Sequence, residues 1–245
     1  MPLSPDQVVL ATQKLIGWAV LLQNIEYFLL NKYALKQKFE FGITKKPYSN
    51  QNFLAIAGII NAIAMLALWD HPEVIFIALL LSLTISYQYQ GSFNGGSDSM
   101  THLVLLGLGF STLFGPGQWQ QQAGVYFIAV QSLFSYSIAG WVKLKNPFWR
   151  NGESLKKIIL ESNYDLPIII KSIAAYWPVL KIISWTIIIF EVLFLYFLYT
   201  CPLVTLICAA LFHLLIFYLF GLNRFFWVWL STYPSLFYLS EIFRK

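Results

Sequence analysis

Seven or eight apolar runs of roughly bilayer-spanning length occupy most of this 245-residue chain. A helix needs about 20 residues to cross the hydrocarbon core of a bilayer, and somewhat shorter helices are tolerated. The runs are residues 8–30, 53–69, 74–89, 100–114, 125–142, 180–199, 203–222 and 225–239. The fourth and eighth are short or broken, and Pro234 in the last run indicates a kinked or re-entrant helix. The pattern predicts an all-α, polytopic transmembrane bundle with seven to eight spans.

The composition of the chain agrees with a membrane protein. Hydrophobic residues make up 58% of the sequence and charged residues only 11%, whereas about a quarter of a soluble domain is charged. The mean hydropathy is +0.64. No soluble segment, repeat or low-complexity tract interrupts the runs, so we expect a single transmembrane helical domain over residues 1–245.

The net charge of +5 does not indicate nucleic-acid binding. The lysines lie in loops between the apolar runs, and no basic helix with interleaved aromatic residues is present. Cys201 and Cys208 lie seven residues apart in one run, too far for a disulfide within a helix, and no metal-ligand spacing occurs. Nucleic-acid, redox-disulfide and metal-site functions are therefore disfavoured, and the cysteines are expected to serve packing.

Basic residues concentrate in two connections, residues 31–51 and the amphipathic segment 145–177. Four predicted crossings separate these connections, so they should lie on the same side of the membrane. Because cytoplasmic loops carry an excess of Lys and Arg, that side is predicted to be the cytoplasm, with the N-terminus outside.

Lys143 stands at the closing end of the fifth run, where the membrane core should give way to a polar boundary. A lysine at that depth either extends its ammonium group to the polar boundary or loses its proton. In the first case Lys143, like Lys145, marks the wet end of a helix. In the second case a neutral, desolvated lysine can act as a general base. The spacing alone leaves both interpretations open.

Three further polar residues of the runs are candidate functional groups. Glu191 and His213 lie in the sixth and seventh runs, on either side of the short turn 200–202. We expect these runs to pack as an antiparallel hairpin that brings Glu191 and His213 within reach of each other or of a shared water. Asp98 immediately precedes the predicted fourth helix, where an N-cap role is the ordinary expectation.

The order of these features resembles the horizontally transferred transmembrane (HTTM) domain, which is the membrane part of vitamin K-dependent gamma-carboxylases and of many bacterial relatives. The most specific stretch is 138–152, in which Gly140 and Lys143 are followed by Trp149 and Gly152. Weaker similarity covers 4–17 (Gln13-Lys14-Leu-Ile-Gly17), 95–107 (Gly95-Gly-Ser-Asp98-Ser-Met) and 212–237 (Phe212-His213, Gly221 and Ser231 to Phe237).

The resemblance implies quinol chemistry at a bacterial inner membrane. A lysine matching Lys143 deprotonates a vitamin K-like hydroquinone in the carboxylases, and His213 and Asp98 would be supporting polar groups. The aromatic residues expected to contact such a cofactor are Trp141, Trp149, Phe212 and Trp227.

Two departures from the carboxylase pattern leave a second class of function open. The carboxylases have a histidine where this sequence reads Gly96-Ser-Asp98-Ser-Met100, and His102 is out of register with it. They also carry a large extramembrane substrate-binding domain, whereas this chain ends at Lys245. We therefore expect either a quinol-dependent membrane enzyme that modifies a separately encoded peptide or a non-catalytic scaffold in the maturation or export of a secreted peptide. Membrane lipid is the expected partner in both cases.

Overall fold

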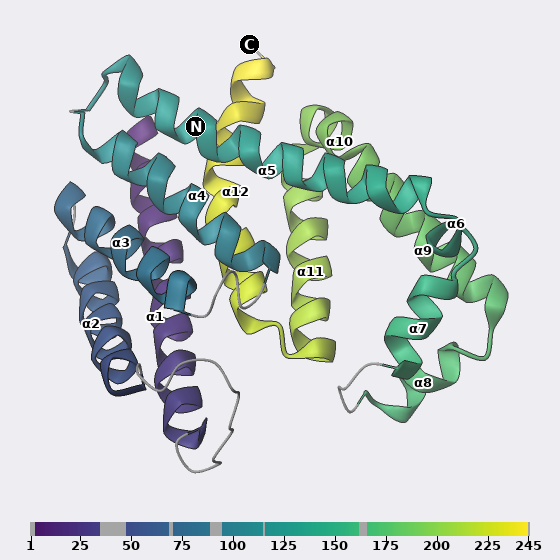
Figure 1. The fold of residues 1–245 in the computed structure, drawn as a ribbon. Helices are drawn as coiled ribbons and strands as arrows, with labels where there is room; N and C mark the ends of the chain where they lie inside the picture. Colours follow the sequence, from purple (N-terminus) through teal and green to yellow (C-terminus); the bar gives the residue numbers. More distant parts are fainter. Residues whose placement is uncertain are drawn as a thin grey trace. The chain divides into compact units, whose positions relative to one another are not determined.

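The computed structural model describes residues 3–34, 48–68, 71–88, 95–114, 116–161 and 166–244. Every regular element in these ranges is a helix (Figure 1). The predicted all-α class is therefore confirmed for the described part of the chain. Most of the basic connection expected at 31–51, including Lys36, Lys38, Lys45 and Lys46, lies outside the described residues.

Each of the eight apolar runs coincides with a helix or a helix pair. These elements are α1 (Pro5–Ala34), α2 (Tyr48–Ala67), α3 (Pro72–Gln88), α4 (Gly95–Thr112), α5 (Trp119–Lys145), α9 (Trp177–Val192) with α10 (Phe194–Thr200), α11 (Pro202–Phe220) and α12 (Asn223–Phe243). The connection between α5 and α9 carries three short helices, α6 (Pro147–Arg150), α7 (Glu153–Glu161) and α8 (Ile168–Ile173).

Among the described residues, three helices are long and apolar enough to cross a membrane: α1 over Pro5–Leu30, α5 and α11. The α9–α10 pair is a fourth candidate, but the two helices meet at an angle of 67°. The chain is therefore a membrane protein by the length and composition of these helices, and the predicted number of seven to eight spans stays a prediction. The break falls in the sixth run at Leu193, whereas the last run forms one helix that continues through Pro234.

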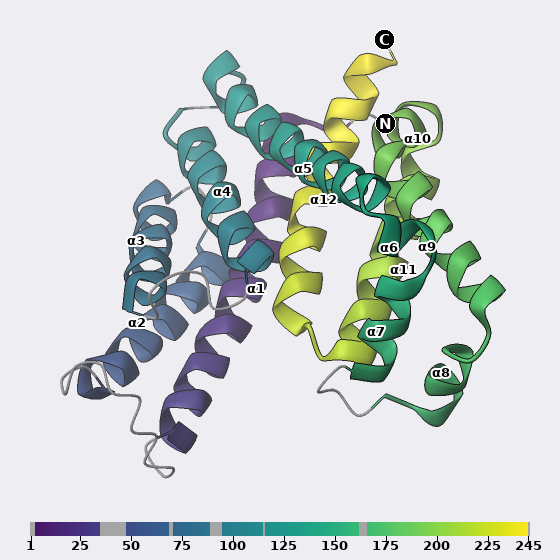
Figure 2. The same cartoon turned by 45° about the vertical axis from the view of Figure 1, so that its right-hand side comes forward.

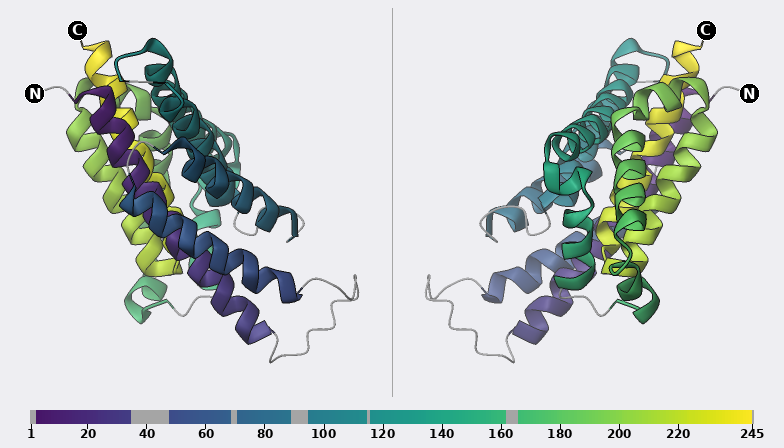
Figure 3. Two further views of the ribbon diagram at one scale, coloured as in Figure 1. Left: turned by 90° about the vertical axis from the view of Figure 1, so that its left-hand side faces the viewer. Right: turned by 90° about the vertical axis from the view of Figure 1, so that its right-hand side faces the viewer.

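The described chain divides into two compact units. The first unit consists of residues 1–129 and 227–238, and therefore holds α1 to α4 with parts of α5 and α12. Helices α1 and α2 lie side by side in it (Figure 3). The side chain of Gln13 donates to the carbonyls of Met65 (2.9 Å) and Leu68 (2.7 Å), and Lys14 Nζ donates to the carbonyl of Leu66. The carbonyls at the end of a helix have no intrahelical donor, so α1 completes the end of α2.

The second unit consists of residues 130–226 and 239–245 and contains the second half of α5 and helices α6 to α11 (Figure 2). After α5 the chain turns into α6, which begins with Pro147 at its first position. The Asn146 side chain caps α6 by accepting from the Phe148 N–H at 2.9 Å. The prediction of a single domain over residues 1–245 stays a prediction.

Candidate functional site

The candidate site is built on one face of α5 within the second unit. Tyr136, Gly140 and Lys143 follow one another at spacings of four and three residues, and such residues share a helix face. Each of them contacts the α9–α11 segment. This face therefore organises the polar residues of the unit.

Lys143 forms a bidentate ion pair with Glu191 of α9. The Lys143 ammonium donates to both carboxylate oxygens, at 2.8 Å to Oε1 and 2.7 Å to Oε2. The Lys143 side chain is 18% exposed and the Glu191 side chain only 6%. Charged groups at such depth are normally paired, because an isolated ion is very costly to remove from water. Lys143 therefore lies in the last turn of α5 with its charge paired.

Gly140 allows α9 to come close enough for this ion pair. A Cβ atom on Gly140 would lie 2.6 Å from the Val192 nitrogen and 2.9 Å from the carbonyl carbon of Glu191. Small residues at helix contacts in membranes let the two backbones approach each other. The backbone of α9 therefore rests directly on Gly140, one turn away from Lys143.

The rest of the Gly-Lys-Trp-Gly motif also contacts α9. Lys143 Nζ lies 5.3 Å from the centre of the Trp149 ring, within cation–π range. The Trp149 carbonyl accepts a hydrogen bond from the Ser184 hydroxyl of α9. Gly152 has φ +87°, and a Cβ there would lie 3.0 Å from the Lys181 nitrogen. All four motif residues therefore take part in holding α9 near the end of α5.

A second buried polar pair joins α5 to α11. The Tyr136 hydroxyl and His213 Nε2 share a hydrogen bond of 2.8 Å, and both residues are buried. The Tyr136 ring stacks on Phe194 of α10, with the ring centres 3.8 Å apart and the planes inclined by 8°. Glu191 therefore bonds to Lys143 and His213 to Tyr136, and the expected proximity of Glu191 and His213 to each other or to a shared water stays a prediction. Beyond the 67° bend after Glu191, α10 packs against α11.

Tyr136→Phe is expected to lower the free energy of unfolding by about 1 kcal/mol, the usual size of an interhelical hydrogen bond in a membrane protein. The stacking on Phe194 should persist, because only the hydroxyl is lost. Thermal unfolding in detergent would measure the change against Tyr196→Phe, a substitution of a tyrosine that is 61% exposed. Equal stability of the two variants would show that the hydrogen bond to His213 contributes nothing.

The other sequence-predicted site residues are distributed over both units. Asp98 and Trp227 belong to the first unit. Asp98 is buried in the first turn of α4, inside the helix and not before it, and accepts from the Gln23 amide at 3.4 Å. The Trp227 ring packs edge-on against Trp18 at 6.1 Å.

In the second unit, Trp149 is the predicted cofactor contact that lies beside Lys143. Trp141 is 53% exposed, and its ring lies 5.0 Å from Lys145 Nζ. Phe212 packs beside Phe190, with ring centres 6.5 Å apart.

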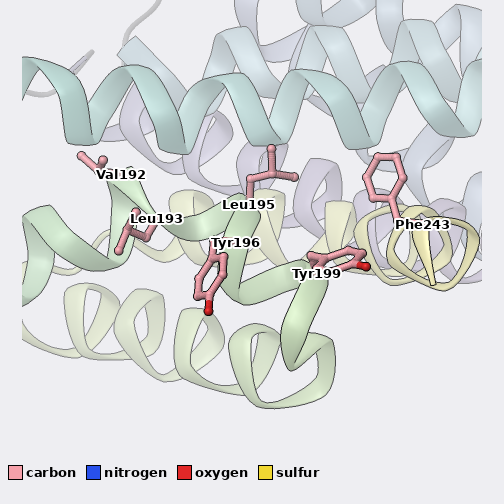
Figure 4. A pocket seen from close by; sticks show the side chains of 6 residues that line it. All are labelled: Val192, Leu193, Leu195, Tyr196, Tyr199 and Phe243. Carbon is pink, nitrogen blue, oxygen red and sulfur yellow. The ribbon is translucent and has the colours of Figure 1, made fainter.

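An open apolar pocket of about 570 Å³ lies along α10, and Lys143, Glu191 and Trp149 are not among its lining residues (Figure 4). This volume lies within the range of small-molecule sites. The lining is aliphatic and aromatic, and the hydroxyls of two tyrosines supply its side-chain polar groups. The lining residues are Val192, Leu193, Leu195, Tyr196, Tyr199 and Phe243.

No family model matches this chain, and no curated protein or solved structure is detectably similar to it. The site is therefore interpreted from its own chemistry. Sequence reasoning singled out Lys143 and Glu191 separately and did not identify Tyr136. The spacing of Tyr136, Gly140 and Lys143 on one face of α5 was the available signal.

Proposed function

We propose that this protein is a multi-pass, HTTM-type protein of the bacterial inner membrane in which the Lys143–Glu191 pair moves a proton of a quinol-like substrate. The observation that carries the proposal is the buried, bidentate ion pair beside the Trp149 ring. Ionisable groups inside a membrane protein are rare and commonly belong to proton-transfer or ligand sites.

The pair supplies a way for Lys143 to act as a base. A lysine must be neutral to accept a proton. At 2.7 Å the Lys143 ammonium can transfer a proton to the Glu191 carboxylate, which leaves a neutral amine and a carboxylic acid. The amine then takes the proton of a hydroxyl group on the bound substrate and becomes an ammonium again. Glu191 therefore stores the proton that Lys143 must release before it can act.

The surroundings fit a vitamin K-like quinol in two respects. The open pocket along α10, which includes Val192, is apolar and of small-molecule size, as a flat hydrophobic ring requires. The indole of Trp149 adds an aromatic surface beside the base. A bound quinol would supply the acidic hydroxyl groups and the redox chemistry, and the peptide that is modified would come from a separately encoded partner.

A non-catalytic scaffold for the maturation or export of a secreted peptide is the second candidate. It is favoured by the structural use of the whole motif, because Gly140, Lys143, Trp149 and Gly152 all contact α9. In this case the ion pair fixes helix packing and carries no proton.

Lys143→Arg separates the two functions. Arginine keeps the positive charge and can pair with Glu191 through two hydrogen bonds, but it does not release a proton in a protein. We expect the Arg variant to fold normally and to lose about 10²-fold or more of any quinol oxidation, the usual contribution of a general base. The assay uses the protein in lipid nanodiscs with reduced menaquinone and oxygen and follows quinol consumption.

Lys145→Arg serves as the matched control and should leave quinol consumption unchanged. Organic extraction of purified wild-type protein, followed by mass spectrometry, should also detect a bound quinone. Full activity in Lys143→Arg, or the absence of both quinone and turnover in the wild-type protein, would reject the enzyme and leave the scaffold.

A further inference from the structure

The connection between α5 and α9 forms a small layer of its own in the second unit. Helix α7 buries Ile159, and the layer has a core of Ile159, Leu166, Ala174 and Leu180. Ile170 and Ile173 of α8 pack against this core. The inner sides of α7 and α8 are therefore occupied by the protein itself.

The outer side of this layer is apolar and uncovered. Ile168 is 83% exposed and Ile169 is 73% exposed, although both are among the most apolar residues of the chain. Three further large residues of this connection are exposed: Leu160 of α7, Tyr176 just before α9 and Trp177 at the start of α9. Large apolar residues that are exposed together in one connection indicate an interaction site.

Basic residues accompany this apolar surface. Residues 145–181 contain six Lys or Arg residues and three Asp or Glu residues, a net charge of +3. Lys156 Nζ lies 5.8 Å from the centre of the Trp177 ring, and Lys157 is 3.8 Å from Glu153 within the same helix. A hollow of about 440 Å³ is lined by Glu153, Lys156, Lys157, Leu160, Glu161 and Trp177.

The covalent path of the chain indicates what could cover this surface. Helix α5 ends at Lys145 and is a candidate membrane span, and the next candidate span begins at Trp177. If both candidates cross the membrane, the intervening 31 residues leave and re-enter it on one side. Amphipathic segments that combine lysines with exposed aliphatic and aromatic residues bind at the lipid–water boundary. Trp and Tyr are themselves enriched at that boundary.

We propose that the outer side of α7 and α8 lies on the membrane surface, with Ile168 and Ile169 in the interfacial layer and Lys156 and Lys157 bound to the phosphates of anionic lipids. Basic clusters next to a membrane span bind anionic headgroups in this way. This surface is independent of the Lys143–Glu191 pair and does not depend on any catalytic activity.

The experiment measures how deeply α8 enters the lipid. A cysteine replaces Ile169 in a protein whose Cys201 and Cys208 are changed to serine, and it carries the environment-sensitive dye NBD. The protein is reconstituted into vesicles of phosphatidylcholine with or without phosphatidylglycerol. We expect a blue-shifted emission and quenching by lipids with a nitroxide near the headgroup. The same dye at Gln118, an exposed residue immediately before α5, should show a water-like emission.

The lipid charge is tested with Lys156→Gln and Lys157→Gln. Each should reduce the additional blue shift that phosphatidylglycerol produces, whereas Arg244→Gln should not. Raising the salt from about 0.1 to about 1 M should have a similar effect, because the screening length falls from about 10 to about 3 Å. Size-exclusion chromatography confirms that each variant remains folded.

Two results would overturn the proposal. Water-like emission from the dye at position 169 in vesicles would show that the surface faces solvent. A blue-shifted emission seen only in native membrane fragments would show that a protein partner covers the surface. Equal emission in both vesicle types, unaffected by the lysine substitutions, would reject the binding of anionic headgroups.

Discussion

Glu191→Ala is expected to lower the free energy of unfolding by about 3–5 kcal/mol, the cost of leaving one member of a buried ion pair without its partner. Lys143 is only 18% exposed, so its ammonium has little access to water once Glu191 is gone. The change would be measured by chemical unfolding in mixed micelles, followed by tryptophan fluorescence.

The double variant Lys143→Met with Glu191→Leu should recover most of this loss, because well-packed apolar residues can replace a buried ion pair at little cost. Glu161→Ala provides the control, since Glu161 is an exposed carboxylate and surface substitutions change stability by about 0.5 kcal/mol or less. If Glu191→Ala were as stable as Glu161→Ala, the ion pair would have no role in the fold.

The helices of this protein could be predicted from its sequence because the apolar runs are long and the breaks between them are polar. All eight runs coincide with helices. The ends were less predictable: α4 begins at Gly95, before Asp98, because the Gly-Gly-Ser sequence joins the helix although it is not apolar. The length of an apolar run does not show whether polar residues before it belong to the first turn of the helix.

The ionisable residues of the site could also be found from the sequence, because charges inside apolar runs are rare. Their pairing could not be predicted. Counting residues from the turn at 200–202 assumes straight helices, whereas the sixth run bends by 67° at Leu193. Lys143 was considered as an isolated group, whereas its partner lies 48 residues away in the sequence.

The break at Leu193 has no proline or glycine of its own, although these are the usual causes of a kink. Backbone hydrogen bonds continue on both sides, from the Leu193 N–H to the Ile189 carbonyl and from the Phe197 N–H to the Leu193 carbonyl. Two contacts with α5 instead hold the last residues of α9. Gly140 packs against their backbone, and Lys143 forms an ion pair with the Glu191 side chain. Contacts between distant segments of this kind leave no signal in the local sequence.

Gly140→Ala is expected to destabilise the protein by about 1–3 kcal/mol, as other overpacking substitutions do. The sign of this stability change is informative, because replacing glycine by alanine within a helix ordinarily stabilises the helix by about 0.5–1 kcal/mol. The added Cβ would lie 2.6 Å from the Val192 nitrogen, and a backbone atom cannot rotate away as a side chain can. The helices must therefore separate, which also lengthens the Lys143–Glu191 contact. Chemical unfolding would measure the loss.

A double-mutant cycle connects this substitution to the ion pair. If Gly140→Ala acts by separating α5 from α9, part of the cost of Glu191→Ala is already incurred in the Gly140→Ala protein. The two losses should then be non-additive by about 0.5–3 kcal/mol, as is usual for residues in contact. Ile138→Ala, on the same helix and 61% exposed, should add independently to Glu191→Ala. Strict additivity of Gly140→Ala and Glu191→Ala would mean that the close backbone contact and the ion pair are separate features of the fold. If Gly140→Ala alone stabilised the protein, α9 would not rest on Gly140.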